Sequence, residues 1–232
     1  MNDQPHSHAR GAISVLLVDD HAIVREGYRS LLQKQPGLKV AGEADDGISA
    51  YRLYKELSPD IVIMDLSMQG VGGIEAIRRI RGWDANARIL VFTMHDNSAF
   101  ATQALRAGAK GYVTKSSAPV VLIEAIYDVL KGRRALSPDI SHALALTYLN
   151  DEPRVLDVLT PREFEILRML VAEKSTAEIA ETLCLSPKTV ANAHYLIKSK
   201  LGVASDIELV HMVFRQNVFA DPPIDGMSTV HE

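Results

Sequence analysis

The chain has 232 residues, of which 47% are hydrophobic and 23% charged, as in an ordinary globular protein of one large or two small domains. No apolar run approaches the about 20 residues that a membrane-spanning helix needs, and the polar N-terminus lacks the apolar core of a signal peptide. A net charge of −4 gives no bulk attraction to nucleic acids, and the single cysteine, Cys184, excludes an intrachain disulfide and fits a cytoplasmic protein.

Residues 1–12 are polar, and we expect them to form a disordered tail. From residue 13 to 131, short apolar runs alternate with longer amphipathic segments. The apolar runs predict strands at about 13–19, 38–44, 61–65, 88–93 and 111–114. The amphipathic segments predict helices at about 21–34, 47–57, 73–81, 97–107 and 119–131. This alternation indicates an α/β fold, a flavodoxin-like, doubly wound parallel sheet of five strands.

The third apolar run, residues 61–65, ends in a single carboxylate, Asp65. Such a run predicts a strand that is buried on both faces and ends at the edge where α/β proteins bind ligands. Other strand ends carry matching chemistry, namely Asp19, Asp20, Thr93 and Lys115. Because right-handed crossovers place the carboxyl ends of parallel strands on one edge, we expect these side chains to converge.

The chemistry of this group favours phosphoryl transfer. Neighbouring carboxylates repel one another unless a cation intervenes, and Mg²⁺ prefers carboxylate, water and phosphate oxygens. A lysine and a hydroxyl can neutralise and hydrogen-bond a phosphoryl group, and an aspartate can be the nucleophile. Taken singly, each residue is as well explained by helix caps and turns. Together, in this order, they predict metal-assisted phosphoryl transfer onto Asp65.

Residues 13–131 resemble the receiver domain of bacterial two-component response regulators. The resemblance rests on Asp19-Asp20, Asp65 within residues 64–68, Gly73, Thr93, and Lys115 within residues 110–115. It implies that a sensor histidine kinase phosphorylates Asp65. It also implies a Mg²⁺ site made of Asp20, Asp65 and the backbone carbonyl of Ser67, with Asp19 acting through water.

The same resemblance assigns three residues to the switch: Lys115 pairs with the phosphoryl group, Thr93 moves toward it, and Tyr112 turns inward. Gln69 departs from the family, which usually has proline four residues after the phosphorylated aspartate. Ser67 and His95 occupy positions that resemble those tuning the phosphoryl lifetime, although His95 also reads as a partly exposed loop residue. The presence of Gln69 in place of proline removes none of the groups needed for phosphoryl transfer.

The rest of the chain carries no strand pattern. Residues 132–159 predict a linker with one helix at about 138–149, which begins at Ser137-Pro138. Helices are then expected from the capping box at residues 160–163 and at about 176–184, 187–201 and 205–216. These elements predict a small all-α domain at residues 160–217, followed by a loose tail at 218–232.

Residues 160–217 resemble the helix-turn-helix output domain of the NarL/FixJ, LuxR-type family. The matching segments are residues 159–163, 178–180, 185–190 and 200–203. The resemblance implies that helix 187–201 is the recognition helix in the major groove of promoter DNA, with paired half-sites bound by a dimer. The apolar helix at 205–216 is expected to contribute to the dimer contact or to belong to the core alone.

The predicted DNA-contacting residues are Lys188, Thr189, Ala191, Asn192, His194, Tyr195, Lys198 and Lys200. Three lysines and no acid make this helix locally +3, whereas residues 155–217 carry seven Lys or Arg against eight Asp or Glu, a net charge of −1. Family members often have lysine or arginine at the positions of Ala191, His194 and Tyr195. We therefore expect weak or strongly dimer-dependent DNA binding, and a solvated or core-flanking face is the alternative for His194 and Tyr195.

The sequence therefore predicts a cytoplasmic, homodimeric response regulator that controls transcription, with RNA polymerase as a candidate further partner. It is expected to accept a phosphoryl group and lose it slowly rather than to turn over a substrate. One alternative is a phosphorylation-dependent protein-interaction regulator with weak or lost sequence-specific DNA binding. Another is a haloacid-dehalogenase-like phosphohydrolase, but that family needs a second acid two residues after the nucleophile, where Ser67 stands.

Overall fold

The computed structural model describes residues 12–149, 155–215 and 218–219. Residues 1–11 of the expected N-terminal tail and all but two residues of the expected C-terminal tail lie outside these ranges. Within the described ranges, no helix combines the length and apolar character needed to cross a membrane.

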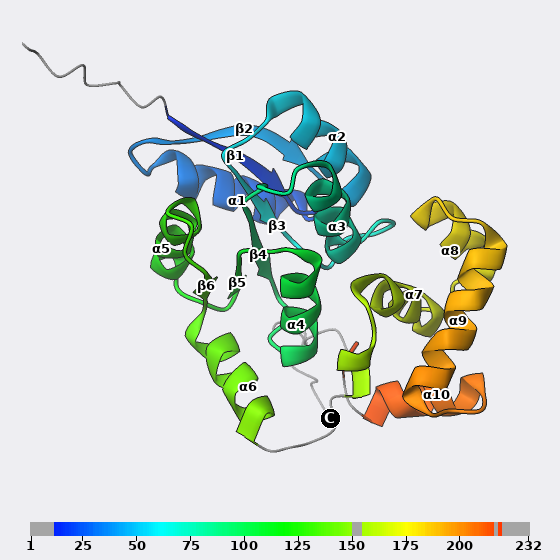
Figure 1. Cartoon of the computed structure of the whole chain (residues 1–232). Helices are drawn as coiled ribbons and strands as arrows, with labels where there is room; N and C mark the ends of the chain where they lie inside the picture. The colour runs from blue at the N-terminus through cyan, green and yellow to red at the C-terminus, as the bar shows by residue number, and fades with distance from the viewer. Residues whose placement is uncertain (1–11, 150–154, 216–217, 220–232) are drawn as a thin grey trace, which may run out of the picture.

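A parallel sheet with the strand order β2-β1-β3-β4-β5-β6 forms the first part of the molecule (Figure 1). Its strands are β1 (Ile13–Val18), β2 (Leu38–Ala44), β3 (Ile61–Met64), β4 (Ile89–Thr93), β5 (Gly111–Thr114) and β6 (Ala135–Leu136). The prediction of five strands was therefore one short. Ala135 and Leu136 pair with Gly111 and Tyr112, and two residues are too few to produce a readable alternation.

Five helices cover the two faces of this sheet. They are α1 (Ala22–Gln33), α2 (Gly47–Leu57), α3 (Gly73–Trp83), α4 (Ser98–Ala107) and α5 (Pro119–Leu130). Apolar residues of α1 and α5 pack on one face, whereas α2, α3 and α4 bury theirs against the other. Asp46 and Asn97 begin α2 and α4 by accepting hydrogen bonds from backbone N–H groups of the first turn. We call this part the sheet unit.

The remaining elements are helical: α6 (Pro138–Leu149), the 3₁₀ helix η1 (Val155–Val158), α7 (Pro161–Val171), α8 (Thr176–Leu183), α9 (Pro187–Leu201) and α10 (Asp206–Arg215). We call α7–α10 the helical module. Thr160 forms the expected capping box, and Ser175 forms a second one with Glu178. Gly202 ends α9 with a φ of 68°, a left-handed conformation that glycine adopts without steric cost.

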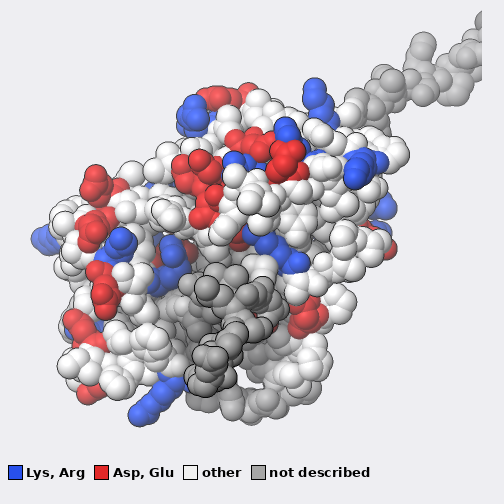
Figure 2. Space-filling model, turned by 180° about the vertical axis from the view of Figure 1, so that it is seen from behind, with Lys and Arg blue, Asp and Glu red and all other residues white. Residues whose placement is uncertain are grey.

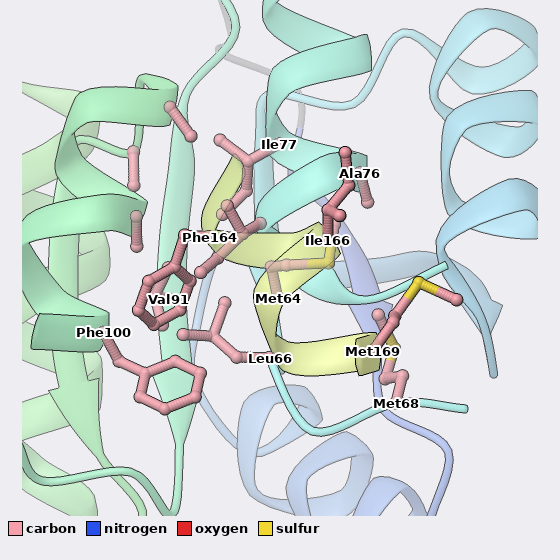
Figure 3. Packing of buried hydrophobic residues seen from close by; sticks show 14 of the residues in the cluster. Met64, Leu66, Met68, Ala76, Ile77, Val91, Phe100, Phe164, Ile166 and Met169 are labelled. Atoms are coloured by element: carbon pink, nitrogen blue, oxygen red, sulfur yellow. The ribbon is translucent and has the colours of Figure 1, made fainter. Parts of the chain in front are cut away.

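The sheet unit and the helical module share one apolar core. Figure 3 shows Phe164, Ile166 and Met169 of α7 together with side chains from β3, the loop after it, α3, β4 and α4. Phe100 of α4 meets Phe164 edge-to-face with ring centroids 5.2 Å apart. The tail predicted to be loose at 218–232 begins with packed residues, because Val218 is buried and Phe219 lies against Phe164. The two parts are therefore docked on each other.

A buried amide fixes the connection between the two parts. Gln103 of α4 is fully buried, and its Nε2 donates hydrogen bonds to the backbone oxygens of Leu156 (3.1 Å) and Leu159 (3.2 Å). Both carbonyls belong to η1 and the residue that follows it. Since unpaired buried carbonyls are costly, this amide ties the start of the helical module to α4.

Candidate functional site

Three strand ends bring opposite charges together at one edge of the sheet. Lys115, which follows β5, places Nζ 2.7 Å from Oδ2 of Asp19 and 2.7 Å from Oδ2 of Asp65. The side chains are almost fully buried, with 7%, 4% and 2% exposed, respectively. The convergence expected from the strand order is thus present.

Local geometry fixes the carboxylate of Asp65. Its Oδ1 accepts hydrogen bonds from the backbone N–H groups of Leu66 (2.6 Å) and Ser67 (3.2 Å). Helix α3 begins directly behind it, since a Cβ atom on Gly73 would lie 2.1 Å from the backbone oxygen of Asp65. Glycine is therefore required at residue 73, because the side chain of any larger residue would push the start of α3 away from the strand end.

The acidic pair after β1 completes a set of oxygen ligands. Asp19, Asp20 and Asp65 each offer a carboxylate oxygen, and these atoms together with a ring nitrogen of His21 lie within 4.8 Å of one another. Asp20 also accepts a hydrogen bond from the backbone N–H of Gln69 at 3.3 Å. This donor set fits Mg²⁺, which prefers one or two carboxylates and keeps several waters. His21, whose Nδ1 lies 2.8 Å from Oδ1 of Asp20, was not predicted.

The charge of Lys115 is stabilised by its surroundings. Burial by itself lowers the pKa of an ammonium group, but the negative charges of Asp65 and Asp19 and their hydrogen bonds outweigh it and raise the pKa of Lys115. Lys115 therefore remains a cation throughout the physiological pH range. Among the described residues, no other cation pairs with Oδ2 of Asp19 or Oδ2 of Asp65, so Lys115 offsets the repulsion between these two buried carboxylates.

The predicted switch residues lie beside this cluster. The Thr93 hydroxyl at the end of β4 is fully buried, and no hydrogen-bond partner for it occurs among the described residues. Tyr112 is also fully buried and donates a hydrogen bond from its hydroxyl to the backbone oxygen of His95 at 2.9 Å. Burial raises the pKa of Tyr112 well above its ordinary value. Tyr112 thus already points inward in this conformation.

His95 connects the cluster to the helical module. Its Nε2 lies 2.9 Å from Oγ of Ser67, and its ring stacks on Phe100 with centroids 3.8 Å apart. Phe100 in turn contacts Phe164 of α7. The interpretation of His95 as a partly exposed loop residue does not hold, since only 7% of it is exposed. Two side chains, His95 and Phe100, therefore link Ser67 in the loop after β3 to the helical module.

A second group of charges lies where α3 meets α7. Glu75 is buried and accepts hydrogen bonds from Arg78 and Arg79, and Arg162 of α7 lies 3.8 Å away. Burial would raise the pKa of Glu75, but the hydrogen bonds from Arg78 and Arg79 outweigh it, so the pKa is lowered. Arg79 also donates to the backbone oxygen of Leu183 at the end of α8. Residue spacing within one helix gave no signal for a network between two parts of the fold.

The predicted recognition helix, α9, faces away from the sheet unit (Figure 1). Most of its predicted contact residues are exposed, including Lys188, Asn192 and Tyr195, whereas His194 and Lys198 are partly buried. The other predicted contact residues are exposed as well and are Thr189, Ala191 and Lys200. All eight residues belong to α9 and are at least partly accessible to solvent while the two parts of the molecule are docked.

The positive charge expected on α9 is largely neutralised. Asp206 of α10 lies 2.8 Å from Nζ of Lys198 and 2.9 Å from Nε2 of His194. Glu163 of α7 lies 2.6 Å from Nζ of Lys200. These carboxylates come from other helices, so counting charges along α9 could not reveal them. The face seen in Figure 2 likewise has positive and negative side chains interspersed.

Two family models match the chain in the order of its two parts. Residues 15–127 match the response regulator receiver domain. Residues 157–213 match the bacterial regulatory proteins of the luxR family. The first match contains the carboxylate cluster, and the second contains α9.

Similar proteins share both parts. The response regulator UvrY of Escherichia coli is 38% identical over 208 residues, which cover 89% of this chain and 95% of that protein. The response regulator GacA of Pseudomonas aeruginosa is 39% identical over 210 residues, covering 89% and 97%.

Two solved structures are also similar to this chain, one over part of it and one over most of it. A LuxR-family two-component response regulator from Aurantimonas sp. is 58% identical, with a TM-score of 0.58 over 59% of this chain and 98% of that one. RcsB from Salmonella enterica serovar Typhimurium, bound to a promoter in the presence of the phosphomimetic BeF₃⁻, is 30% identical, with a TM-score of 0.68 over 87% and 98%. With a receiver domain, a LuxR-type helix-turn-helix domain and relatives of this length, the chain belongs to the NarL/FixJ family of response regulators.

Proposed function

We propose that Asp65 is the phosphoacceptor of this response regulator and that a sensor histidine kinase supplies the phosphoryl group. The observation that carries the proposal is the position of the Asp65 carboxylate. It ends a buried strand, is held by two backbone N–H groups, and lies 2.7 Å from the ammonium group of Lys115. A fixed carboxylate beside a fixed cation is suited to attack a phosphorus atom.

The transfer exchanges one bond to phosphorus for another. An oxygen of Asp65 forms a bond to the phosphoryl group while the bond from the histidine nitrogen of the kinase breaks, and the electron pair of that bond stays on the imidazole. Lys115 then pairs with the phosphoryl oxygens, and the buried hydroxyl of Thr93 donates the hydrogen bond that it lacks among the described residues. Loss of the group follows when water attacks the phosphorus, which restores the carboxylate and releases inorganic phosphate. The protein changes its own charge and turns over no separate substrate.

Magnesium fits the oxygen ligands of this edge. Asp20, Asp65 and the backbone carbonyl of Ser67 would hold the ion, and Asp19 would act through a bound water. When bound, Mg²⁺ neutralises the negative charge that gathers as phosphorus passes between the two nucleophiles. The protein's own contribution is to hold these oxygens together despite their repulsion.

The output that we propose is binding of promoter DNA by a phosphorylated homodimer, through α9 in the major groove. An RcsB structure contains two dimers on two DNA molecules, and that relative is 30% identical to this chain. We propose a receiver domain at residues 13–131, a linker at 132–159, an output domain at 160–217, and a cytoplasmic location. RNA polymerase is a further candidate partner.

The test replaces Asp65 by asparagine and follows phosphorylation and DNA selection together. Asp65→Asn should lose Mg²⁺-dependent labelling by acetyl phosphate and the phosphorylation-dependent enrichment of genomic DNA fragments. Asp45→Asn removes an exposed carboxylate from another strand end of the sheet and serves as the matched control. Undiminished labelling of Asp65→Asn, or equal loss in Asp45→Asn, contradicts the assignment.

A protein-interaction regulator with weak or lost sequence-specific DNA binding is the second candidate. The observation that favours it is the pairing of Lys198 and Lys200 with carboxylates of the same module, which leaves little positive charge for phosphates. If phosphorylated protein enriches no DNA motif at near-physiological salt, while phosphorylation still changes its oligomeric state, this second function replaces the first.

A further inference from the structure

Four groups on α9 can carry positive charge, and intramolecular carboxylates hold three of them. Lys198 and His194 share Asp206, and Lys200 is paired with Glu163. Lys188 forms no ion pair with a carboxylate in the described ranges. Any DNA phosphate that approaches the C-terminal half of α9 therefore meets cations that already have an anion beside them.

The two carboxylates differ in what else they hold. Glu163 is 12% exposed, and its Oε2 also accepts a hydrogen bond from the backbone N–H of Thr160 in the capping box of α7. Its pairing with Lys200 is therefore part of the module's framework. Asp206 is 64% exposed and begins α10, so water reaches it from most sides. Exposed pairs of this kind contribute little to folding stability and exchange readily.

We propose that Asp206 limits the DNA affinity of α9 by competing with phosphate for Lys198 and His194. This inference deepens, and rests on, the proposed DNA-binding function. A phosphate that contacts Lys198 through Nζ lies close to the Asp206 carboxylate, which is 2.8 Å from the same nitrogen. Two anions then face one cation, so the contact gains less than a free lysine would give.

The expected size follows from simple electrostatics. Repulsion between two unit charges about 6 Å apart in water corresponds to an affinity change of about 3-fold for one half-site and about 10-fold for a dimer. Removing the competing anion also frees Lys198 to neutralise a phosphate fully. The dependence of the logarithm of the binding constant on the logarithm of salt should therefore steepen by up to about 0.9 per half-site.

A structural role for Asp206 makes a different prediction. An acid in the first turn stabilises a helix through its dipole, and Asp206 is such a residue in α10. If this were its only role, Asp206→Asn would lower thermal stability slightly and leave both the affinity and its salt dependence unchanged. A readout that separates the two roles is the salt slope, which a small loss of helix stability does not move.

The experiment phosphorylates the full-length chain with acetyl phosphate and Mg²⁺ and measures its binding to a short fluorescent duplex of mixed sequence, by anisotropy between about 50 and 200 mM salt. Wild type is compared with Asp206→Asn, Lys198→Gln and the double variant. Glu181→Gln is the matched control, because it removes one exposed negative charge from α8 of the same module, and no ion pair joins Glu181 to α9 among the described residues.

Asp206→Asn should bind the duplex about 3-fold to 10-fold more tightly with a steeper salt slope, while Glu181→Gln changes affinity less. In the Lys198→Gln background, the gain from Asp206→Asn should shrink, because the cation for which the two anions compete is gone. If the wild type binds the duplex and Asp206→Asn changes neither the affinity nor its salt dependence, this inference is overturned, while the DNA-binding function stands. Absence of duplex binding by every variant at the lowest salt overturns the DNA-binding function itself.

Discussion

The carboxylate cluster of the sheet edge and the charged surface of α9 are both groups of ion pairs, but they differ in burial. Lys115, Asp19 and Asp65 are each less than 10% exposed, whereas Asp206 beside Lys198 is mostly exposed. Breaking a buried pair leaves an uncompensated charge and is costly, while an exposed pair is nearly neutral for stability. The same type of contact is therefore a fixed component at one site and an exchangeable one at the other.

This difference suits the two proposed tasks. At the sheet edge, the charged groups of Asp65 and Lys115 must already be in place when the phosphoryl group arrives, because rearranging buried charges during the transfer would slow the reaction. At Lys198 of α9, a DNA phosphate must be able to replace the exposed carboxylate of Asp206, because a pair that does not exchange would block this contact. Variants that remove single charges should therefore affect folding at the first site and ligand affinity at the second.

The largest effect is expected for Lys115→Ala. It leaves Asp19 and Asp65 buried without their shared cation, and we expect the free energy of unfolding to fall by about 3 kcal/mol in the absence of Mg²⁺. Urea denaturation measures this change. Added Mg²⁺ should restore part of the stability without restoring the response to phosphorylation.

Lys110→Ala is the matched control, since Lys110 lies at the opposite end of the same strand, directly before β5. It should cost less than about 1 kcal/mol, as for other surface lysines. Equal destabilisation by the two variants would show that loss of a long side chain, rather than loss of the buried cation, is responsible.

The sequence predicted the sheet edge well because each contribution is local. A run such as residues 61–64 predicts a buried strand, and the topology of α/β folds then places Asp19, Asp65 and Lys115 together without knowledge of packing. The strand ends also placed Thr93 at this edge, whereas the switch roles of Thr93 and Tyr112 came only from the resemblance to receiver domains. What their hydroxyl groups contact could not be predicted, because it depends on the path of the loop that carries His95.

Three features could not be predicted because they depend on surfaces meeting in three dimensions. Strand β6 needs the edge of β5 as a template, and its two residues carry no periodicity. The docking of α7 on α3 and α4 depends on side chains far apart in the sequence, such as Phe100 and Phe164. Likewise, the partners of the α9 lysines come from α7 and α10, so a charge count within one helix overestimates its positive field.

The next largest effect is expected where the two parts dock. Glu75→Gln removes the buried carboxylate that holds Arg78, Arg79 and Arg162 together, and we expect docking to weaken by about 2 kcal/mol. Small-angle scattering should show a larger radius of gyration for the variant. Because α9 is already exposed in the docked conformation, DNA affinity should change by less than about 2-fold.

Glu56→Gln is a suitable control, since Glu56 is an exposed carboxylate on α2. A variant Glu75→Gln that stays as compact as wild type contradicts the role of this carboxylate in docking. A large gain in DNA affinity on undocking would instead mean that the docked sheet unit restrains α9 by some route other than covering it.

Acidification tests the ion pairs of Glu75 in the wild-type protein, because protonation removes the charge of its carboxylate. The pKa of Glu75 is lowered in the folded protein, below its ordinary value of 4.5, mainly by hydrogen bonds from Arg78 and Arg79 that outweigh burial. Its contribution is therefore fully present above pH 4.5 and is lost as the pH falls through the lower folded value. Compactness of wild type should decrease in that acidic window, and Glu75→Gln should show a smaller decrease. Identical acid profiles would remove Glu75 from the explanation.

The smallest effect separates two lysines of α9 that the sequence treats as equivalent. Lys188 has no carboxylate within ion-pair distance in the described parts of the chain, whereas Lys200 is held by Glu163. Lys188→Gln should weaken duplex binding by about 3-fold at low salt and reduce the salt slope by about 0.9 per half-site. Lys200→Gln should change affinity less, because its charge is already compensated, and should instead lower thermal stability slightly. Equal effects of the two substitutions on the salt slope would mean that a DNA phosphate displaces Glu163 from Lys200 as easily as it displaces water from Lys188. The carboxylates paired with α9 would then all be exchangeable, including the less exposed Glu163.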